Sequence, residues 1–291
     1  MTNTLHYLLA GLSIGSVYGM IALGFAVMWH AAKAVNFSYG TLFMLGGVLT
    51  VAFTWWGLPL LLAGLGAIAA AVVAAAVIER AFVRPFNREA NAIGWMLTTI
   101  AAGVMIESAT TATYGSLGHP LPSPLVQEPL RIAGAGIYPQ ELLLPATLIG
   151  ITTALELVYR RTMLGRALRA VAFNRAAAGL VGIDADRITL IAFAIAGFIG
   201  ALAGFLVAPV VQASSTMGMV VGLKGFLVAI VAGIDNTRGV VLVGVLFGML
   251  EKFLEGYVST AGRDAIAFTA MILALLFFPQ GLFGRRVMQK V

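Results

Sequence analysis

Residues 58–80 read Leu-Pro-Leu-Leu-Leu-Ala-Gly-Leu-Gly-Ala-Ile-Ala-Ala-Ala-Val-Val-Ala-Ala-Ala-Val-Ile-Glu-Arg, an apolar run with no charged residue before Glu79. A helix needs about 20 mainly apolar residues to cross the hydrocarbon core of a bilayer. The run is continuously apolar, whereas the strands of a membrane β-barrel alternate between apolar and polar residues. This stretch therefore predicts a membrane-spanning helix.

The composition extends this interpretation to the whole chain. Of its 291 residues, 60% are hydrophobic and only 10% are charged. Soluble domains carry about 25% charged residues, so a soluble enzyme, a disordered chain and a nucleic-acid-binding domain are excluded as default interpretations. The chain has no cysteine and three scattered histidines, which predicts no disulfide, metal site or cofactor. The N-terminus lacks a basic region followed by a cleavage site, so its first apolar run is expected to be a retained span.

Further apolar runs predict most of the remaining spans. A shorter run at 222–234 leaves three alternatives open: a tilted span, a half-helix or a re-entrant segment. The expected fold is an all-α polytopic membrane protein with eight or nine transmembrane helices, forming one transmembrane domain over 1–291. The longer runs lie near residues 5–29, 40–56, 58–80, 93–114, 141–159, 188–212, 238–257 and 264–280.

The basic residues predict the orientation, because Lys and Arg accumulate in cytoplasmic loops. The loop at about 115–140 is Pro-rich and contains Arg131 as its only basic residue, so it is expected to be an irregular external connection. Counting spans then places the N-terminus outside and the C-terminus in the cytoplasm if 222–234 is a crossing. The net charge of +6 thus indicates topology and not a nucleic-acid partner. Twelve of the 18 Lys and Arg residues form three patches: Arg80, Arg84 and Arg88; Arg160, Arg161, Arg166, Arg169, Arg175 and Arg187; and Arg285, Arg286 and Lys290.

Two segments of the chain resemble each other and enter the membrane from opposite sides. Gly11-Leu-Ser-Ile-Gly15 precedes Asn36-Phe-Ser-Tyr-Gly40, and Gly200-Ala-Leu-Ala-Gly204 precedes Met217-Gly218 and Gly222. Similar segments of opposite entry are typical of inverted repeats in transporters. We expect a first repeat over about 5–159, a cytoplasmic loop over about 160–187 and a second repeat over about 188–284.

Ionisable residues inside the apolar runs are candidates for a path or for structural pairing. A charged residue at the centre of a spanning helix costs about 2.5–3.5 kcal/mol on an insertion scale, so it should face protein or water. We expect Lys224 to pair with Glu251 or Glu107 and to hold the outer ends of the helices together. The competing interpretation makes Glu107 a proton or substrate site.

The basic loop at 160–187 contains the run Arg166–Val181, which has good helix propensity. We expect one short helix along the inner membrane surface. The charge alone leaves two alternatives open, a basic anchor on anionic lipid and a docking helix for a soluble partner. The run Gly218–Gly225 does not have the spacing of a phosphate-binding loop, so ATP binding by this chain is not expected.

Several segments together resemble the permease subunits of branched-chain amino-acid ABC importers, and most closely the first, shorter permease of the usual pair. The resemblance extends from about residue 8 to 286. The segments are Gly11-Leu-Ser-Ile-Gly-Ser-Val-Tyr-Gly-Met-Ile-Ala-Leu-Gly24, Val35-Asn-Phe-Ser-Tyr-Gly-Thr-Leu-Phe-Met-Leu-Gly46, Gly165-Arg-Ala-Leu-Arg-Ala-Val-Ala172, Leu180-Val-Gly-Ile-Asp-Ala-Asp-Arg187 and Phe278-Pro-Gln-Gly-Leu-Phe-Gly284.

The resemblance implies a type II-like ABC importer permease in a bacterial cytoplasmic (inner) membrane. The implied partners are a second homologous permease, two cytoplasmic ATP-binding subunits, an external substrate-binding protein and membrane lipid. It also implies that the basic loop docks onto an ATP-binding subunit, through Arg166, Arg169, Asn174, Arg175 and Gly182.

The same resemblance implies a non-enzymatic chain that forms half of a path for branched-chain or other hydrophobic amino acids. Asn36, Phe37 and Gly40 match the loop that follows the first span in this family, where Gly40 allows close helix approach and Asn36 satisfies a broken helix end. Urea, amides and aromatic acids are alternative substrates of the same fold, and an ion-coupled secondary transporter is the alternative mechanism.

Overall fold

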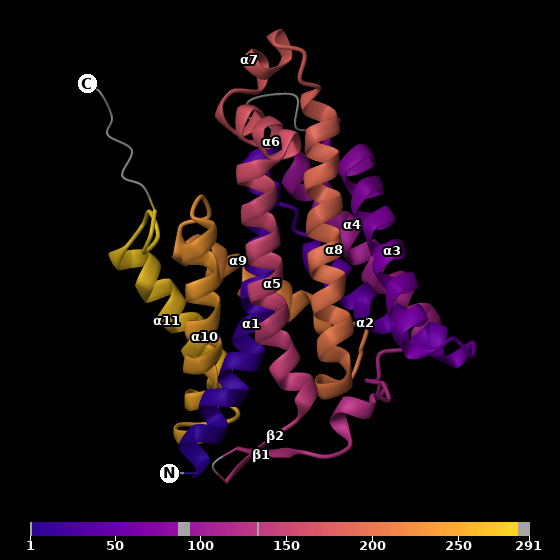
Figure 1. Cartoon of the computed structure of the whole chain (residues 1–291), viewed down its shortest axis with the longest axis vertical. Helices are drawn as coiled ribbons and strands as arrows, with labels where there is room; N and C mark the ends of the chain where they lie inside the picture. Colours follow the sequence, from indigo (N-terminus) through magenta and orange to yellow (C-terminus); the bar gives the residue numbers. More distant parts are fainter. Residues whose placement is uncertain (1, 87–93, 133, 285–291) are drawn as a thin grey trace.

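The apolar runs fold into helices at the positions that the sequence predicts (Figure 1). The computed structural model describes residues 2–86, 94–132 and 134–284; residue 93, the expected start of one span, lies outside these ranges. A π-helical turn, Glu79–Val83, continues α3. The helices are α1 (Thr2–Ala32), α2 (Tyr39–Trp55), α3 (Leu60–Ile78), α4 (Gly94–Tyr114), α5 (Pro139–Arg161), α6 (Met163–Phe173), α7 (Arg175–Leu180), α8 (Ala185–Val211), α9 (Met217–Ala232), α10 (Thr237–Tyr257) and α11 (Arg263–Phe277).

Four of the described helices are long and apolar enough to cross a membrane by length and composition: Thr4–Ala32, Leu60–Val83, Pro139–Arg161 and Ala185–Val211. The helices α2 and α9 are apolar but shorter, with 17 and 16 residues. At 1.5 Å per residue each is about 25 Å long, which is less than the thickness of a typical hydrocarbon core. The structure therefore combines long helices with two short ones.

The helices define two ends of the molecule (Figure 1). The α6 end holds α6, α7 and the turn between α9 and α10; the hairpin end holds the start of α1 and the two strands. At the α6 end, Arg84 reaches the Asp186 carboxylate at 3.9 Å, so the first and second basic patches lie together. Arg88 and the third basic patch lie outside the described residues.

The 115–140 connection is more regular than expected. It contains a 3₁₀ turn (Pro124–Val126) and the strands β1 (Leu130–Ile132) and β2 (Ala135–Ile137), which pair antiparallel with Arg131 opposite Gly136. Gly134 lies between the strands with a φ of 87°, a left-handed conformation that glycine adopts without the steric cost of a Cβ. The expectation of an irregular loop was therefore wrong for this part of the connection.

The helix α1 lies at the centre of the fold and packs against α5, α8, α9 and α10. Its contact with α10 uses glycines on both helices. A Cβ on Gly248 would overlap the backbone of Gly15, and a Cβ on Gly11 would lie 2.7 Å from Cα of Met249. Small residues four apart let helix backbones approach closely in lipid. The glycine spacing of α1 thus serves packing within the chain.

The two resembling segments share a local geometry. Both α1 and α8 are followed directly by a non-glycine residue of positive φ, Lys33 at 51° and Gln212 at 67°, which are the only such residues in the described ranges. A short turn and a short helix follow each of them. The two short helices α2 and α9 then meet at their first turns, where a Cβ on Gly222 would lie 2.8 Å from Cα of Gly40.

The basic loop forms two helices and not the single helix that was predicted. Asn174 separates α6 from α7, and its side chain accepts a hydrogen bond from the N–H of Ala177 at 3.0 Å. Asparagine is a favoured N-cap because its oxygen satisfies a backbone donor that has no partner within the helix, so it starts a new helix here. Asp184 caps α8 in the same way, accepting from the N–H groups of Asp186 and Arg187 at 3.1 Å.

Candidate functional site

A cavity of about 260 Å³ lies on the crossing of α2 and α9, and α4 covers one side of it. We call it the crossing pocket. It brings together three of the residues that the sequence places near a path, Phe37, Gly40 and Glu107. Asn36, Lys224 and Glu251 do not line it. The close approach at Gly40 and Gly222 fixes the floor, because any side chain at these positions would push the two helices apart.

The remaining wall of the crossing pocket is apolar and partly aromatic. The Phe226 ring lies 5.3 Å from Phe37 and 5.5 Å from Phe25, both centroid to centroid. Phe37 is positioned from α4, since its N–H donates to Oγ1 of Thr99 at 3.3 Å, and its ring stacks on Trp95 at 6.4 Å. Aromatic pairs at these separations hold each other in place, so this wall is built before any ligand arrives.

Asn36 is fully buried just before α2. Its Oδ1 accepts hydrogen bonds from N–H of Ser38 at 3.0 Å and from Oγ of Ser38 at 2.6 Å. Its Nδ2 has no hydrogen-bond partner in the described residues. The side chain thus organises the turn that precedes α2.

Lys224 lies in a buried charge cluster that joins three helices. Its Nζ donates to Oε1 of Glu251 at 2.6 Å and to Oδ1 of Asp264 at 2.8 Å, and lies 3.4 Å from the hydroxyl of Tyr18. Only 3% of Lys224 and 4% of Glu251 is exposed. Of the two expected partners the structure pairs Lys224 with Glu251, whereas Glu107 stands at the crossing pocket.

The sequence interpretation missed Asp264 and Tyr18. Asp264 lies in the first turn of α11, where an acidic residue is common because it complements the helix dipole. Tyr18 lies among small and apolar residues of α1. Neither position carries a local signal of a contact with Lys224, so only the packing of α1 and α11 against α9 reveals these contacts.

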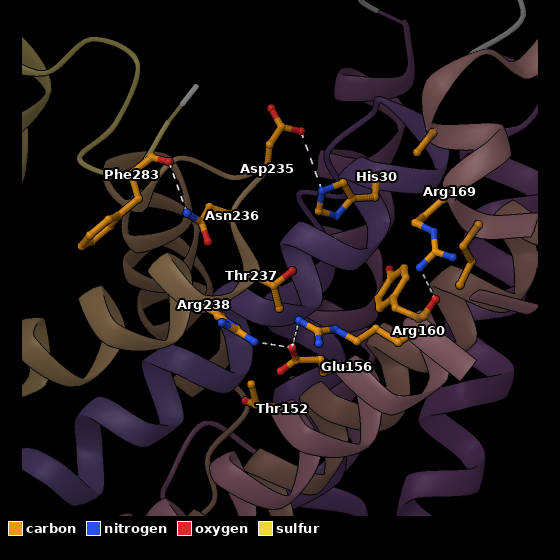
Figure 2. Close-up of a pocket in the computed structure, with 13 residues that line it drawn as sticks. His30, Thr152, Glu156, Arg160, Arg169, Asp235, Asn236, Thr237, Arg238 and Phe283 are labelled. Carbon is orange, nitrogen blue, oxygen red and sulfur yellow. Dashed lines mark hydrogen bonds and ion pairs between the residues drawn. The ribbon is translucent and has the colours of Figure 1, made fainter. Parts of the chain in front are cut away.

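A larger cavity of about 490 Å³ lies at the α6 end, between α6, the ends of α1 and α5, and the start of α10. We call it the α6 pocket (Figure 2). Glu156 accepts a hydrogen bond from Arg238, which links α5 to α10, and forms an ion pair within α5 with Arg160 at 2.7 Å. His30 lies 3.8 Å from the Asp235 carboxylate. The sequence interpretation missed this pocket; the i, i+4 spacing of Glu156 and Arg160 was its one visible signal.

The residues predicted to dock a partner mainly hold the basic loop in shape. Arg169 donates to the backbone carbonyl of Tyr159 and Arg175 to the carboxylate of Asp186. Arg166 is exposed, and Gly182 has a φ of 82°, which a side chain would strain.

Apolar side chains are the most exposed part of this loop. Phe173 is 95% exposed and Leu180 is 91% exposed. Nothing in the described residues covers them, so they form an apolar surface at the α6 end.

Arg84 fixes the end of α3 beneath this loop. It donates from Nε and Nη2 to the two oxygens of the buried Glu79 carboxylate at 3.1 and 3.0 Å. These hydrogen bonds are the main reason that the pKa of the Arg84 guanidinium is raised above its usual value. The Arg84 guanidinium also donates to the backbone carbonyl of Asp186 at 3.2 Å and so ties the end of α3 to α8.

Long apolar helices, a pocket within them and a basic loop at one end define a polytopic membrane transport protein. A family profile described as "Branched-chain amino acid transport system / permease component" matches residues 7–278. The chain belongs to this family.

Relatives match the chain along its whole length. It is 28% identical over 302 residues to the high-affinity branched-chain amino acid transport system permease protein LivH of Escherichia coli strain K12, covering 99% of this chain and 97% of LivH. It is also 28% identical over 310 residues to the corresponding permease protein BraD of Pseudomonas aeruginosa, covering both chains completely.

A solved structure, PsaBC from Streptococcus pneumoniae in complex with Fab, has a chain of similar fold. The TM-score is 0.53 at 12% sequence identity, over 98% of this chain and 96% of that one. At this identity the likeness concerns the fold alone.

Proposed function

We propose that this chain is the membrane-spanning permease subunit of an ATP-driven ABC importer and forms half of a path for branched-chain or other hydrophobic amino acids. The match of residues 7–278 to the permease family carries the proposal. The relatives LivH and BraD, both described as branched-chain amino acid transport permeases, support the substrate class. The proposed partners are a sister permease, two ATP-binding subunits and an external binding protein.

Uptake into proteoliposomes tests this function. Vesicles that contain this chain with its sister permease and ATP-binding subunits should accumulate L-leucine when the binding protein is outside and ATP is inside. Vesicles with this chain alone should accumulate none under any ion gradient. Uptake by the lone chain under an ion gradient would contradict an ABC mechanism and support a secondary transporter.

The proposed topology has nine crossings, with the α6 end in the cytoplasm and the hairpin end outside. The clustering of basic residues at the α6 end supports this orientation. In Figure 1 the start of α1 lies at the hairpin end and α11 leads toward the α6 end, as an odd number of crossings requires. We also propose inverted repeats over about 5–159 and 188–284, separated by the coupling loop. The positive φ of Lys33 and Gln212 supports the repeats, because a non-glycine residue of positive φ precedes each short helix.

The absence of cysteine allows a direct test of orientation. In spheroplasts that express this chain without ATP-binding subunits, Leu117→Cys should react with a membrane-impermeant maleimide. Phe173→Cys should react only after lysis, because it lies at the opposite end. Both native side chains are highly exposed, at 76% and 95%, so only the membrane makes the access of the reagent to the two cysteines differ. The reverse labelling pattern would contradict the proposed orientation.

The proposed coupling route starts at Phe173 and Leu180, which would enter a groove of an ATP-binding subunit. The route continues through Arg169, which joins α6 to the last turn of α5. Glu156 and Arg238 then connect α5 to α10 across the α6 pocket. A movement of α6 would therefore shift α5 and α10 together, and ATP-driven closure would favour one of two packings of the permease halves.

The double substitution Phe173→Asp and Leu180→Asp should abolish co-purification of the ATP-binding subunits and reduce ATP-dependent uptake at least tenfold. Removal of fully desolvated apolar anchors commonly costs an interface 2 kcal/mol or more each, about a 30-fold loss of affinity. Leu117→Asp is the matched control, with similar exposure at the hairpin end. Retained co-purification in the double variant would exclude these residues as the docking surface.

A further inference from the structure

Among the residues that the structure describes, Glu107 is the only one with a charged side chain that lines the crossing pocket. It is half-buried, and no hydrogen bond or ion pair joins it to another residue of the described ranges. The buried Lys224, by contrast, is paired with Glu251 and Asp264. An unpaired carboxylate in an apolar helix is too costly to leave against lipid, so this face requires a cationic group or water.

The shape and the wall of the pocket restrict the ligand further. At about 260 Å³ the crossing pocket is smaller than the roughly 300–1,000 Å³ pockets of drug-sized ligands. Phe25, Phe37 and Phe226 offer apolar surface on the side of α1 and α9, and Ile100 and Val104 complete it from α4. This wall favours a small molecule with an aliphatic part.

Backbone donors complete the set of contacts. The crossing pocket is lined by first-turn residues of two helices, Gly40 of α2 and Gly218 of α9. The N-cap residues Ser38 and Thr216 make no side-chain cap hydrogen bond to these helices. The N–H groups of Tyr39, Thr41 and Met217 already donate to backbone carbonyls. The start of a helix still carries partial positive charge, and this charge favours a carboxylate at the crossing pocket.

We infer that the crossing pocket binds one aliphatic α-amino acid during its passage, with its ammonium group on Glu107 and its side chain against the phenylalanines. The carboxylate of the bound amino acid faces the first turns of α2 and α9. The inference deepens the proposed function and rests on it, because it assigns to this chain a substrate contact of its own.

The permease complex without the binding protein is the material for the test. Equilibrium binding of radiolabelled L-leucine to the assembled complex in nanodiscs should be saturable. Glu107→Gln should weaken it at least tenfold, because the amide cannot neutralise the ammonium group. Glu107→Asp should retain part of the binding, and the neighbouring Ser108→Ala should leave it unchanged. If Glu107→Gln fails to assemble, Phe226→Ala provides the second variant and should weaken leucine binding without removing the charge.

Two leucine analogues separate the contacts. Isopentylamine, which keeps the ammonium group, should compete with leucine in the native complex and fail to compete in Glu107→Gln. The compound 4-methylpentanoate, which lacks the ammonium group, should compete poorly in both. Equal competition by the two analogues in the native complex would overturn the assignment of the ammonium group to Glu107.

The inference and the proposed function fail in different ways. Normal ATP-dependent uptake by a complex that binds no leucine would overturn the inference that the crossing pocket binds the amino acid, and it would leave the proposed importer function intact. Unchanged binding in Glu107→Gln with lost uptake would assign Glu107 a structural role and also overturn the inference. An assembled native complex that shows no ATP-dependent uptake of any amino acid would contradict the importer itself.

Discussion

Replacing Lys224 with methionine should destabilise the chain by about 3–5 kcal/mol, because it leaves the buried Glu251 carboxylate with only Arg263, whose Nε lies 4.0 Å away, as a counter-charge. One oxygen of this carboxylate, Oε2, already has no hydrogen-bond partner in the described residues. Thermal unfolding of the purified chain in detergent, followed by fluorescence-detected size exclusion, measures the effect. We expect a large drop in the melting temperature or loss of the monodisperse peak.

Two further variants show whether the loss comes from the unpaired charge. The double variant Lys224→Met and Glu251→Met should recover most of the stability, since replacing both members of a buried ion pair with apolar residues is often neutral or better. Lys252→Met is the matched control. Lys252 pairs with Glu255 at 2.8 Å in a more exposed position, so its loss should cost about 1 kcal/mol or less. A Lys224→Met variant that is stable but does not transport would contradict a structural role and would place the cluster in the transport path.

The second large effect is expected at the crossing of α1 and α10. Gly248→Ala places a Cβ on the backbone of Gly15, and a backbone cannot swing aside as a side chain does. Overpacking of this kind costs about 1–3 kcal/mol and sometimes more, although alanine favours helix by about 1 kcal/mol over glycine. The same thermal assay should therefore show clear destabilisation.

Gly150→Ala is the control for this prediction. Gly150 lies in α5, and a Cβ there would meet nothing within 4 Å, so only the gain in helix propensity remains. The isolated chain should be as stable as the native one or slightly more stable. Equal effects of the two substitutions would contradict the close approach of α1 and α10.

The helices could be predicted from the sequence because each one carries its own signal, a continuous apolar run. The break at Asn174 was also visible as a residue type, yet the run Arg166–Val181 has helix propensity on both sides of it. Helix propensity is averaged over a window of residues, so it does not detect a single capping hydrogen bond. The capping hydrogen bond of Asn174 is what divides α6 from α7. This explains why one helix was expected where two exist.

The candidate site was predictable only in part, because its contacts join residues far apart in the chain. The cost of burying charge predicted a partner for Lys224 and offered two, Glu251 and Glu107. The choice between them depends on how α4, α9 and α10 pack, which no local pattern encodes. The α6 pocket was missed for the same reason, since Glu156 and Arg238 become neighbours only when α5 and α10 lie side by side.

The charge cluster has a consequence for how the chain enters the membrane during synthesis. Lys224 lies near the middle of the short helix α9, whereas both of its counter-charges, Glu251 and Asp264, follow in α10 and α11. A nascent α9 therefore presents an uncompensated ammonium group to the translocon, at a cost of about 2.5–3.5 kcal/mol for a central lysine. That cost disappears only when the last helices have been made. The stable insertion of α9 thus depends on the C-terminal part of the chain, and truncation before α10 should leave α9 outside the bilayer core.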